Sequence, residues 1–406
     1  MTPLLRRVVL KDYKSIKACN VSLGSLAFLV GPNGSGKSNF LDALRFVADA
    51  LRTSLDHAMR ERGGINEVRR RSSGHPTHFG VRLEYVLPDG ASGHYAFRIG
   101  AQPGGGFVVQ NEECVVHPAD VTASSASYAV TSGSVKSSSQ APPPAQPDRL
   151  YLVNAAGLPE FRPVYDALSR MGFYSLNPDE IRTLQKPDQG DLLRRDGSNI
   201  ASVVDQMEKR HDSGKIRIEE FLEKVVPGVR GVAHRTVGGM ETLEFRQDVP
   251  GAKAPWKFPA ASMSDGTLRA LGILVALLQA RNGPNDQAVT VPLVGIEEPE
   301  LALHPAAAGV ILDALREASK RTQVLVTSHS PDLLDDERLE TSSILAVMAK
   351  SGETQIASLD EVGRKALHDH LYTAGELLRL NQLLPDPDEL SHLVGRQLQL
   401  FGEHAN

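Results

Sequence analysis

The chain has 406 residues, 41% of them hydrophobic, and a formal net charge of -5 at pH 7. This length fits one large domain or two to three ordinary ones, and the mildly acidic balance excludes a wholly basic protein that wraps nucleic acid, though not a local basic face. Two cysteines, Cys19 and Cys114, make no disulfide framework, and the longest apolar run is 271–278. We therefore expect a cytoplasmic protein with no membrane-spanning segment and no secretion signal.

The first part of the chain predicts strands around one helix. Apolar runs and alternation predict strands at 8–10, 26–30 and along 79–116, with a Pro-Asp-Gly turn at 88–90. Between the first two strands, 11–17 is polar enough to be a solvated turn. Apolar residues at helical spacing from Phe40 predict a helix that runs to about Arg60 and ends at Gly63-Gly64.

The middle of the chain changes character twice. Residues 118–148 are dominated by Ala, Ser, Thr, Gly and Pro, which predicts a flexible surface insertion that contributes little to a core. Apolar spacing within 150–230 predicts mainly helices. Strand-like alternation returns at 229–247.

The last part mixes helices and strands. Helices are expected at 268–280, about 304–320, 374–382 and 387–400, and strands at 291–296, 323–327, 343–348 and 354–358. The motifs described below flank the insertion, so it interrupts one fold. We therefore divide the chain into an N-terminal lobe (1–117), the insertion (118–149), a helical lobe with return strands (150–260) and a C-terminal lobe (261–406).

A glycine-rich loop follows the strand at 26–30. Residues 31–38 read G-x-x-x-x-G-K-S, which is the pattern of a phosphate-binding loop that opens a helix. Lys37 would reach the β- and γ-phosphates of ATP, and the Ser38 hydroxyl would bind Mg²⁺. The alternative is a chance glycine-rich turn, but strand and helix stand on the correct sides. The candidate nucleotide-binding residues are Asn33, Gly34, Ser35, Gly36, Lys37, Ser38 and Asn39.

Polar residues follow two later apolar strands. Glu297 and Glu298 end the first of these, where one carboxylate can serve the metal and the other can act as general base. We assign Glu297 to the metal and Glu298 to the base; the alternative is a pair of solvated carboxylates. His329 follows the second strand and could sense a γ-phosphate by hydrogen bonding, although a lone histidine there is more often structural.

Taken in order, four stretches resemble the ABC-class ATPase head. They are the phosphate loop, Ser264-Asp265-Gly266-Thr267, Glu297-Glu298-Pro299-Glu300 and Ser328-His329-Ser330-Pro331. The chain looks most like the bacterial RecF/SMC-like group of AAA-type ATPases, over about 1–120 and 150–380. This resemblance implies an α/β P-loop NTPase fold of the ABC-ATPase head type, with mixed sheets around the phosphate-loop helix and an inserted helical lobe.

The resemblance also implies further roles. Lys14 and Ser15 match the stretch that borders the base and ribose of ATP. Ser264, Asp265 and Gly266 match the signature motif, which contacts the γ-phosphate of ATP held by a second protomer, and 300–302 matches a loop that crosses the dimer interface. One chain has one phosphate loop and one signature motif, so an ATP-dependent head-to-head homodimer is implied.

Three features depart from the wider superfamily. Glu297 stands where Asp is frequent, and the signature reads Met-Ser-Asp-Gly-Thr instead of Leu-Ser-Gly-Gly-Gln, which argues against a transporter subunit. No glutamine occurs between 39 and 101, where a metal-sensing glutamine loop is expected. Asn66 or Glu67 is the candidate replacement.

Basic and histidine clusters suggest competing sites. The basic clusters, which are usually solvated faces but can contact nucleic acid, are Arg60, Arg62 and Arg69-Arg70-Arg71, then Arg194-Arg195, then Lys209-Arg210. The pairs His75/His78 and His368/His370 lack a nearby cysteine or third histidine for zinc.

Two functional hypotheses follow. The first is an ATP-hydrolysing dimerisation switch, with ATP and Mg²⁺ as cofactors, that acts in DNA repair or antiphage defence and engages duplex DNA or a partner nuclease. The second is a regulatory ATP-binding module that holds an effector protein inactive, so that ATP occupancy carries the signal.

Overall fold

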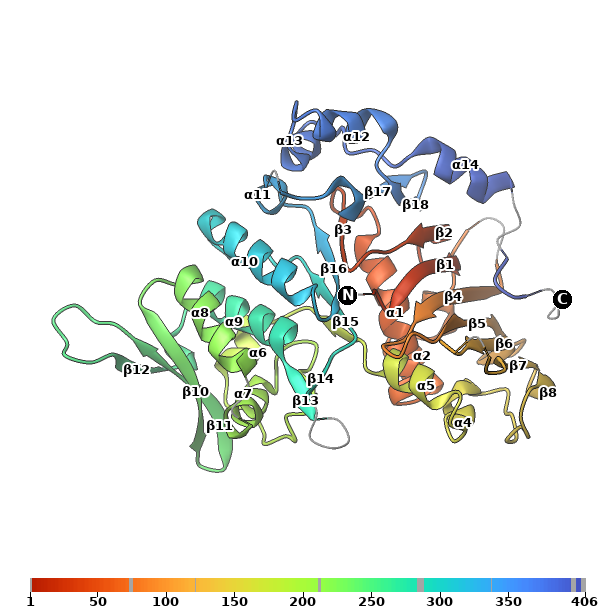
Figure 1. Ribbon diagram of the computed structural model, residues 1–406, viewed down its shortest axis with the longest axis horizontal. Coiled ribbons are helices and arrows are strands. Elements are labelled where there is room, and N and C mark those ends of the chain that lie inside the picture. The colour runs from red at the N-terminus through yellow and green to blue at the C-terminus, as the bar shows by residue number, and fades with distance from the viewer. Residues whose placement is uncertain are drawn as a thin grey trace. The chain divides into compact units, whose positions relative to one another are not determined.

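A computed structural model of the chain describes residues 2–72, 76–120, 122–210, 213–282, 288–336, 338–395 and 399–402. The chain forms two compact units (Figure 1). The first, named here the loop unit, comprises 2–171, 339–372 and 377–406; the second, the acidic unit, comprises 172–338 and 373–376. The expected helical lobe at 150–260 is divided between the units at Met171.

A seven-stranded antiparallel sheet forms one layer of the loop unit, with strand order β2-β1-β4-β5-β6-β7-β8. Its strands are β1 (Leu5–Tyr13), β2 (Ile16–Ser22), β4 (His78–Val86), β5 (Ser92–Ala101), β6 (Phe107–His117), β7 (Ala126–Thr131) and β8 (Ser134–Ser138). The expected strands within 79–116 are confirmed, and the chain turns at Gly90, whose φ of 88° suits glycine.

A solvated turn across 11–17, the alternative that its polarity allowed, is wrong for most of the stretch. β1 continues to Tyr13, which pairs with Ile16 at the start of β2, and only the two residues between them turn. Lys14 takes a φ of 46° there. The strand β2 was not predicted because the polar residues Lys17 and Asn20 interrupt its apolar positions, although Ile16, Cys19 and Val21 are buried.

The insertion at 118–148 was expected to contribute little to a core, and this was also wrong. β7 pairs with β6, and β8 pairs with β7, so the stretch extends the sheet. Tyr128 on β7 is 1% exposed and donates a hydrogen bond to Glu112 at 2.9 Å. Ala126, Tyr128 and Val130, which alternate along β7, are buried, and they supply the packing that a Ser-rich composition concealed.

A second strand set in the loop unit leads to the phosphate loop. β3 (Leu26–Val30) lies parallel to β17 (Ile344–Lys350), which pairs antiparallel with β18 (Glu353–Ser358). The helix α1 (Lys37–Arg52) follows β3, and α2 (Leu55–Arg60) follows after a break that the expected single helix did not have. Ser54 caps α2 by accepting a hydrogen bond from the His57 amide.

The acidic unit is built on three parallel strands. β15 (Leu293–Glu297) pairs with β16 (Gln323–Ser328) on one side and with β9 (Gly172–Tyr174) on the other. The strands β10 (Val229–Val237), β11 (Met240–Gln247) and β12 (Trp256–Pro259) form a small antiparallel sheet, and β13 (Ala280–Asn282) pairs with β14 (Ala288–Thr290). The expected alternation at 229–247 and the strand at 323–327 are confirmed.

Helices complete both units. In the acidic unit they are α6 (Pro178–Arg182), α7 (Ile200–Lys209), α8 (Ser213–Val225), α9 (Asp265–Leu278), α10 (Pro305–Ala318) and α11 (Pro331–Leu334), and α8 packs against α9 and α10. The others are α3 (Ile65–Val68), α4 (Leu152–Ala155), α5 (Arg162–Ser169), α12 (Glu361–His368), α13 (Ala374–Arg379) and α14 (Pro387–Gly395). The end of the helix expected at 387–400 includes 396–398, which lie outside the described residues. Within the described chain, every helix is too short or too polar to cross a bilayer.

Candidate functional site

The phosphate loop connects β3 to α1 through a tight, left-handed backbone. Gly34 and Gly36 have φ values of 75° and 101°, which non-glycine residues rarely adopt. A Cβ atom on Gly31 would lie 1.9 Å from the Val347 carbonyl oxygen, and one on Gly36 would lie 1.9 Å from Thr354 Oγ1. Close packing therefore requires glycine at positions 31 and 36, as is typical of a phosphate-binding loop.

The Lys37 side chain lies over the carbonyls of its own loop. Its Nζ donates to the Gly31 oxygen at 2.7 Å and to the Pro32 oxygen at 3.0 Å, and the residue is only 5% exposed. Lys37 is the first residue of α1, so its ammonium places positive charge at a helix N-terminus, whose free amides also favour an anion. These groups fit a polyphosphate.

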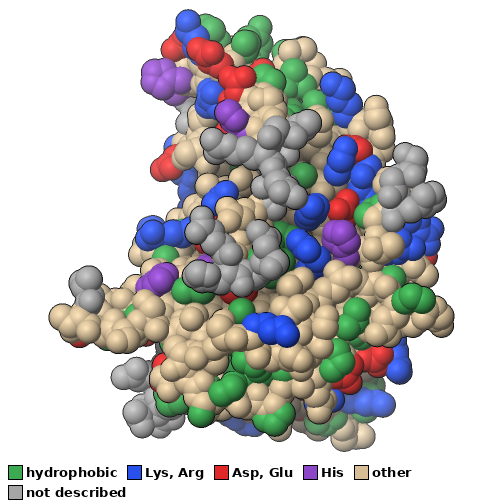
Figure 2. Space-filling view, turned by 90° about the vertical axis from the view of Figure 1, so that its right-hand side faces the viewer, with side chains coloured by type: hydrophobic (Ala, Val, Ile, Leu, Met, Phe, Trp, Pro, Cys, Tyr) green, Lys and Arg blue, Asp and Glu red, His purple; other side chains and the backbone are tan. Residues whose placement is uncertain are grey.

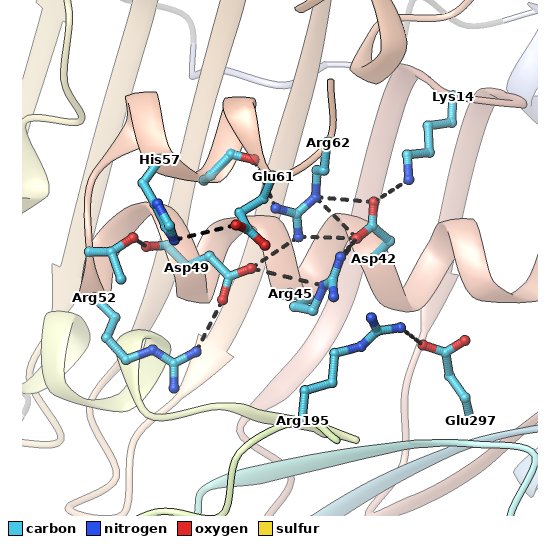
Figure 3. Close-up of polar contacts among 12 residues, drawn as sticks. Lys14, Asp42, Arg45, Asp49, Arg52, His57, Glu61, Arg62, Arg195 and Glu297 are labelled. Atoms are coloured by element: carbon cyan, nitrogen blue, oxygen red, sulfur yellow. Dashed lines mark hydrogen bonds and ion pairs between the residues drawn. The ribbon is translucent and has the colours of Figure 1, made fainter. Parts of the chain in front are cut away.

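The residues expected beside the base and ribose are bound within the loop unit. Lys14 Nζ lies 2.5 Å from Asp42 Oδ2, as Figure 3 shows. Arg62 and Arg45 also bond to Asp42, and Tyr13 donates its hydroxyl proton to the same carboxylate. Burial would raise the pKa of Asp42, but the three cations outweigh burial and hold its pKa well below the usual range. Ser15 and Asn39 are hydrogen-bonded to each other at 2.6 Å.

The acidic pair stands where β15 ends, in the acidic unit. Glu297 is the last residue of the strand, and Glu298 follows with a φ of 45°, a left-handed conformation that costs a non-glycine residue on the order of 1–2 kcal/mol. The Glu298 amide donates to the Thr327 carbonyl at 2.9 Å. This turn gives the two carboxylates different surroundings, which fits different roles for them.

His329 contacts the candidate base directly. Its Nδ1 lies 3.0 Å from Glu298 Oε1, and its backbone amide donates to Glu300 Oε1 at 3.3 Å. Ser328 Oγ donates to the same Glu300 oxygen at 2.7 Å. The structure thus brings together the two residues that the sequence assigned to catalysis, on neighbouring strand ends, with Glu300 fixing the histidine backbone.

Arg195 contacts one of the two carboxylates of the acidic pair. The sequence indicated this arginine only as a member of the basic cluster Arg194-Arg195. Its Nη2 lies 2.9 Å from Glu297 Oε1, the carboxylate assigned to the metal (Figure 3). The Arg195 carbonyl accepts a hydrogen bond from the Ser175 amide at 3.0 Å, just after β9. Because β9 lies parallel to β15, this loop and the acidic pair share the carboxyl edge of the strands.

The signature stretch begins α9. Ser264 accepts a hydrogen bond from the Thr267 amide at 3.2 Å and so caps the helix, while Asp265 pairs with Arg182. Ser264 and Asp265 are both exposed. A Cβ on Gly266 would lie 2.6 Å from the Ala302 carbonyl oxygen, so the signature packs closely on the 300–302 loop of its own chain.

The basic clusters are largely paired with acids. The pairs are Arg60–Asp56, Arg62–Asp49, Arg70–Glu353, Arg71–Glu67, Arg194–Asp188, Lys209–Asp205 and Arg210–Asp191, while Arg69 bonds to Asn66 and to the Pro76 carbonyl. The candidates for the glutamine loop, Asn66 and Glu67, are therefore engaged with neighbouring arginines. Among the described side chains on the face in Figure 2, Lys and Arg stand in separate groups.

The donor chemistry fits Mg²⁺ with ATP. Mg²⁺ prefers hard oxygen ligands and is held by one or two protein oxygens together with phosphates and waters. Ser38 of the loop unit and Glu297 of the acidic unit, the residues that the sequence assigns to the metal, each carry an oxygen donor of this kind. Over the part of the chain that the structure describes, no three His, Cys, Asp or Glu side chains gather to hold a metal without a nucleotide. His75, of one histidine pair, lies outside the described residues.

Comparison with solved structures defines the fold. The SMC head bound to the C-winged helix domain of ScpA matches with a TM-score of 0.54 and 16% identity, over 89% of this chain and 99% of that one. The SMC head with an extended coiled coil, bound to the C-terminal domain of ScpA derived from Pyrococcus furiosus, matches with a TM-score of 0.52 and 15% identity, over 91% and 100%. The fold is that of an ABC-type P-loop NTPase head, as the resemblance implied.

Sequence comparison gives the family. Residues 26–92 and 135–335 match the family described as "AAA domain, putative AbiEii toxin, Type IV TA system". This match spans more than half of the chain, so the chain belongs to this AAA-domain family.

A shorter match connects the chain to RecF. It is 44% identical over 41 residues to the DNA replication and repair protein RecF of Vibrio campbellii (strain ATCC BAA-1116), covering 10% of this chain and 12% of that protein. RecF of Vibrio vulnificus (strain YJ016) matches with the same identity over 41 residues, covering 10% and 11%. The match thus spans about a tenth of the length of these relatives, and the RecF/SMC-like resemblance is confirmed.

Proposed function

We propose that the chain binds ATP with Mg²⁺ on its phosphate loop and hydrolyses it, with Glu298 as the general base. The observation that carries this proposal is the 3.0 Å contact between His329 Nδ1 and Glu298 Oε1 at the carboxyl ends of two parallel strands. A carboxylate fixed by a histidine and by its own turned backbone is oriented to take a proton from water. His329 then acts as its positioning residue.

The other candidate site residues would bind the phosphates of ATP or the Mg²⁺ ion. Lys37 would neutralise phosphate charge from the first turn of α1. Ser38 and Glu297 are the residues that would hold Mg²⁺, which when bound would supply positive charge to the phosphoryl group. Glu297 can serve the metal once Arg195 yields the carboxylate oxygen that lies 2.9 Å from its guanidinium. The two acidic residues thus have separate partners and separate tasks.

We further propose that ATP closes a homodimer through the signature motif. Support comes from the exposed N-terminus of α9, a helix of 14 residues, where Ser264 and Asp265 face solvent. A long helix presents free amides and a positive dipole end to an anion, so this end suits the γ-phosphate of ATP held by a second copy.

The ATP-bound dimer would act on a partner, which is either DNA or another protein. The similarity to RecF supports a role in DNA repair, and the family description supports a defence role beside a toxin-type effector. The pairing of the basic clusters with acids favours a protein partner over the phosphate backbone, because a paired arginine has less charge to offer. The SMC heads to which this chain is similar are bound to ScpA domains, which is also a protein partner.

Two measurements test these proposals. Sedimentation with Mg-ATP should show Glu298→Gln protein as a dimer and the double variant Glu298→Gln/Ser264→Arg as a monomer that still binds ATP; a Glu298→Gln monomer at saturating ATP would refute the dimer. ATP turnover with linear duplex DNA should then be compared across salt concentrations. Severalfold stimulation that fades with salt identifies DNA as the ligand, whereas indifference to DNA supports the protein partner.

A further inference from the structure

Thr354 lies on β18, far along the chain from the phosphate loop, and contacts it directly. Its Oγ1 donates to the Ser35 carbonyl oxygen at 2.9 Å, and its amide donates to the Ser15 carbonyl oxygen at 2.9 Å. The residue is 3% exposed. A buried hydroxyl therefore links β18, the turn after β1 and the phosphate loop within one unit.

The hydroxyls at this point form a relay whose direction is fixed. Ser15 Oγ and Thr354 Oγ1 are 2.7 Å apart, and Asn39 Nδ2 donates to Ser15 Oγ at 2.6 Å. A hydroxyl has one proton to donate, and Thr354 uses its proton on the Ser35 carbonyl, so Ser15 is the donor to Thr354. The relay runs from Asn39 through Ser15 and Thr354 to the loop backbone.

We propose that Thr354 is a positioning residue for ATP binding, because its hydroxyl relay holds the phosphate loop in the form that receives a polyphosphate. This inference rests on the proposed function. The Ser35 carbonyl oxygen carries a partial negative charge and would repel a phosphate if it pointed toward one. Its hydrogen bond from Thr354 Oγ1 holds it away from that direction. The fit is mutual, since Gly36 has no room for a Cβ against the Thr354 side chain.

Ser15 and Asn39 gain a different role from this arrangement. The resemblance and the motif assigned both to direct nucleotide contact, whereas in the structure their side chains take part in the relay that ends at Thr354. They act on ATP through the loop. Thr354 itself lies outside every motif of the sequence, 319 positions from Ser35.

The test compares Thr354→Val, which removes the hydroxyl at nearly constant shape, with Thr354→Ser, which keeps it. We expect Thr354→Val to raise the Kd for a fluorescent ATP analogue about tenfold, and Thr354→Ser to stay within about threefold of the parent. At saturating ATP, the turnover number of Thr354→Val should stay near that of the parent. A Kd for Thr354→Val equal to that of the parent, or an equal loss in Thr354→Ser, would overturn the proposal.

Thr322→Val is the matched control. Thr322 is also buried, at 2% exposed, and donates its hydroxyl proton to the Val291 carbonyl, but in the acidic unit. It should lower the unfolding temperature without changing the Kd, which separates positioning from general destabilisation. If Thr354→Val does not fold, the double variant Thr354→Ser/Ser15→Ala replaces it in the test, because it removes the Ser15 hydroxyl from the relay. The same rise in Kd is expected, and an unchanged Kd would overturn the proposal. Failure of the unaltered protein to bind the analogue would instead refute the proposed function.

Discussion

His329 Nδ1 lies 3.0 Å from Glu298 Oε1, although 31 positions separate the two residues in the chain. The register of β15 against β16 brings them together, because Glu297, the last residue of β15, pairs with Thr327, one residue before β16 ends. The sequence suggested that His329 senses the γ-phosphate. The observed contact adds a second task for the histidine, which is to orient the base.

The first prediction separates these two tasks. Replacing His329 by Ala should lower kcat roughly ten- to hundredfold while KM for ATP changes by less than about threefold, because the base loses its orientation but ATP keeps its loop contacts. Steady-state kinetics measure both constants, and His368→Ala, on exposed α12, is the control. A rise in KM with unchanged kcat would show that His329 binds nucleotide and does not position Glu298.

The second prediction concerns Arg195, which occupies the carboxylate assigned to Mg²⁺. Arg195→Gln should lower the Mg²⁺ concentration for half-maximal turnover by about two- to fivefold, the range expected for release of a partly exposed ion pair. Arg194→Gln is a close control, since Arg194 pairs with Asp188 instead. A higher Mg²⁺ requirement in Arg195→Gln would mean that the arginine holds Glu297 in place for the metal.

The third prediction uses the two left-handed glycines of the phosphate loop. Gly36→Ala meets Thr354 Oγ1 at 1.9 Å, whereas Gly34→Ala meets no atom within 4 Å. Both bear backbone strain of about 1–2 kcal/mol, but only Gly36→Ala adds a steric clash. Thermal unfolding without nucleotide should therefore show a clearly larger decrease in unfolding temperature for Gly36→Ala than for Gly34→Ala. Equal losses would mean that the loop yields to the added methyl group.

The fourth prediction is a pH dependence of stability. Glu112 is buried and accepts hydrogen bonds from Tyr95, Tyr128 and the amides of Tyr151 and Leu152; burial raises its pKa to about 7. Between pH 4.5 and 7 the unfolded carboxyl ionises while the folded one stays protonated. The contribution of Glu112 to the free energy of unfolding is thus full below pH 4.5 and falls by on the order of 3 kcal/mol as pH rises through 7.

Urea unfolding of the unaltered protein and Glu112→Gln at pH 4.5 and 7.5 measures this contribution. The unaltered protein should lose more stability than Glu112→Gln over this interval, since the amide does not ionise. Parallel losses in the two proteins would show that Glu112 keeps an ordinary pKa.

The sequence predicted the parts of the structure that are formed by residues close together in the chain. The strand, glycine loop and helix around Lys37 are contiguous, so their order alone indicated the phosphate-binding loop, and the resemblance carried by all four motif stretches implied the fold class. β7 and β8 were missed because small residues hide the burial of Tyr128, which only the neighbouring strand reveals. Arg195–Glu297 and Thr354–Ser35 could not be predicted, because their partners lie 102 and 319 positions apart and only tertiary packing joins them.

The role of Glu298 as general base is tested by replacing its carboxylate with an amide. Glu298→Gln keeps the size of the side chain but cannot accept the proton, so ATP turnover should fall at least about hundredfold while the Kd for ATP stays within about threefold. Glu361→Gln, on the exposed start of α12, should match the unaltered protein. Turnover by Glu298→Gln at the rate of the unaltered protein would mean that Glu298 is not the general base.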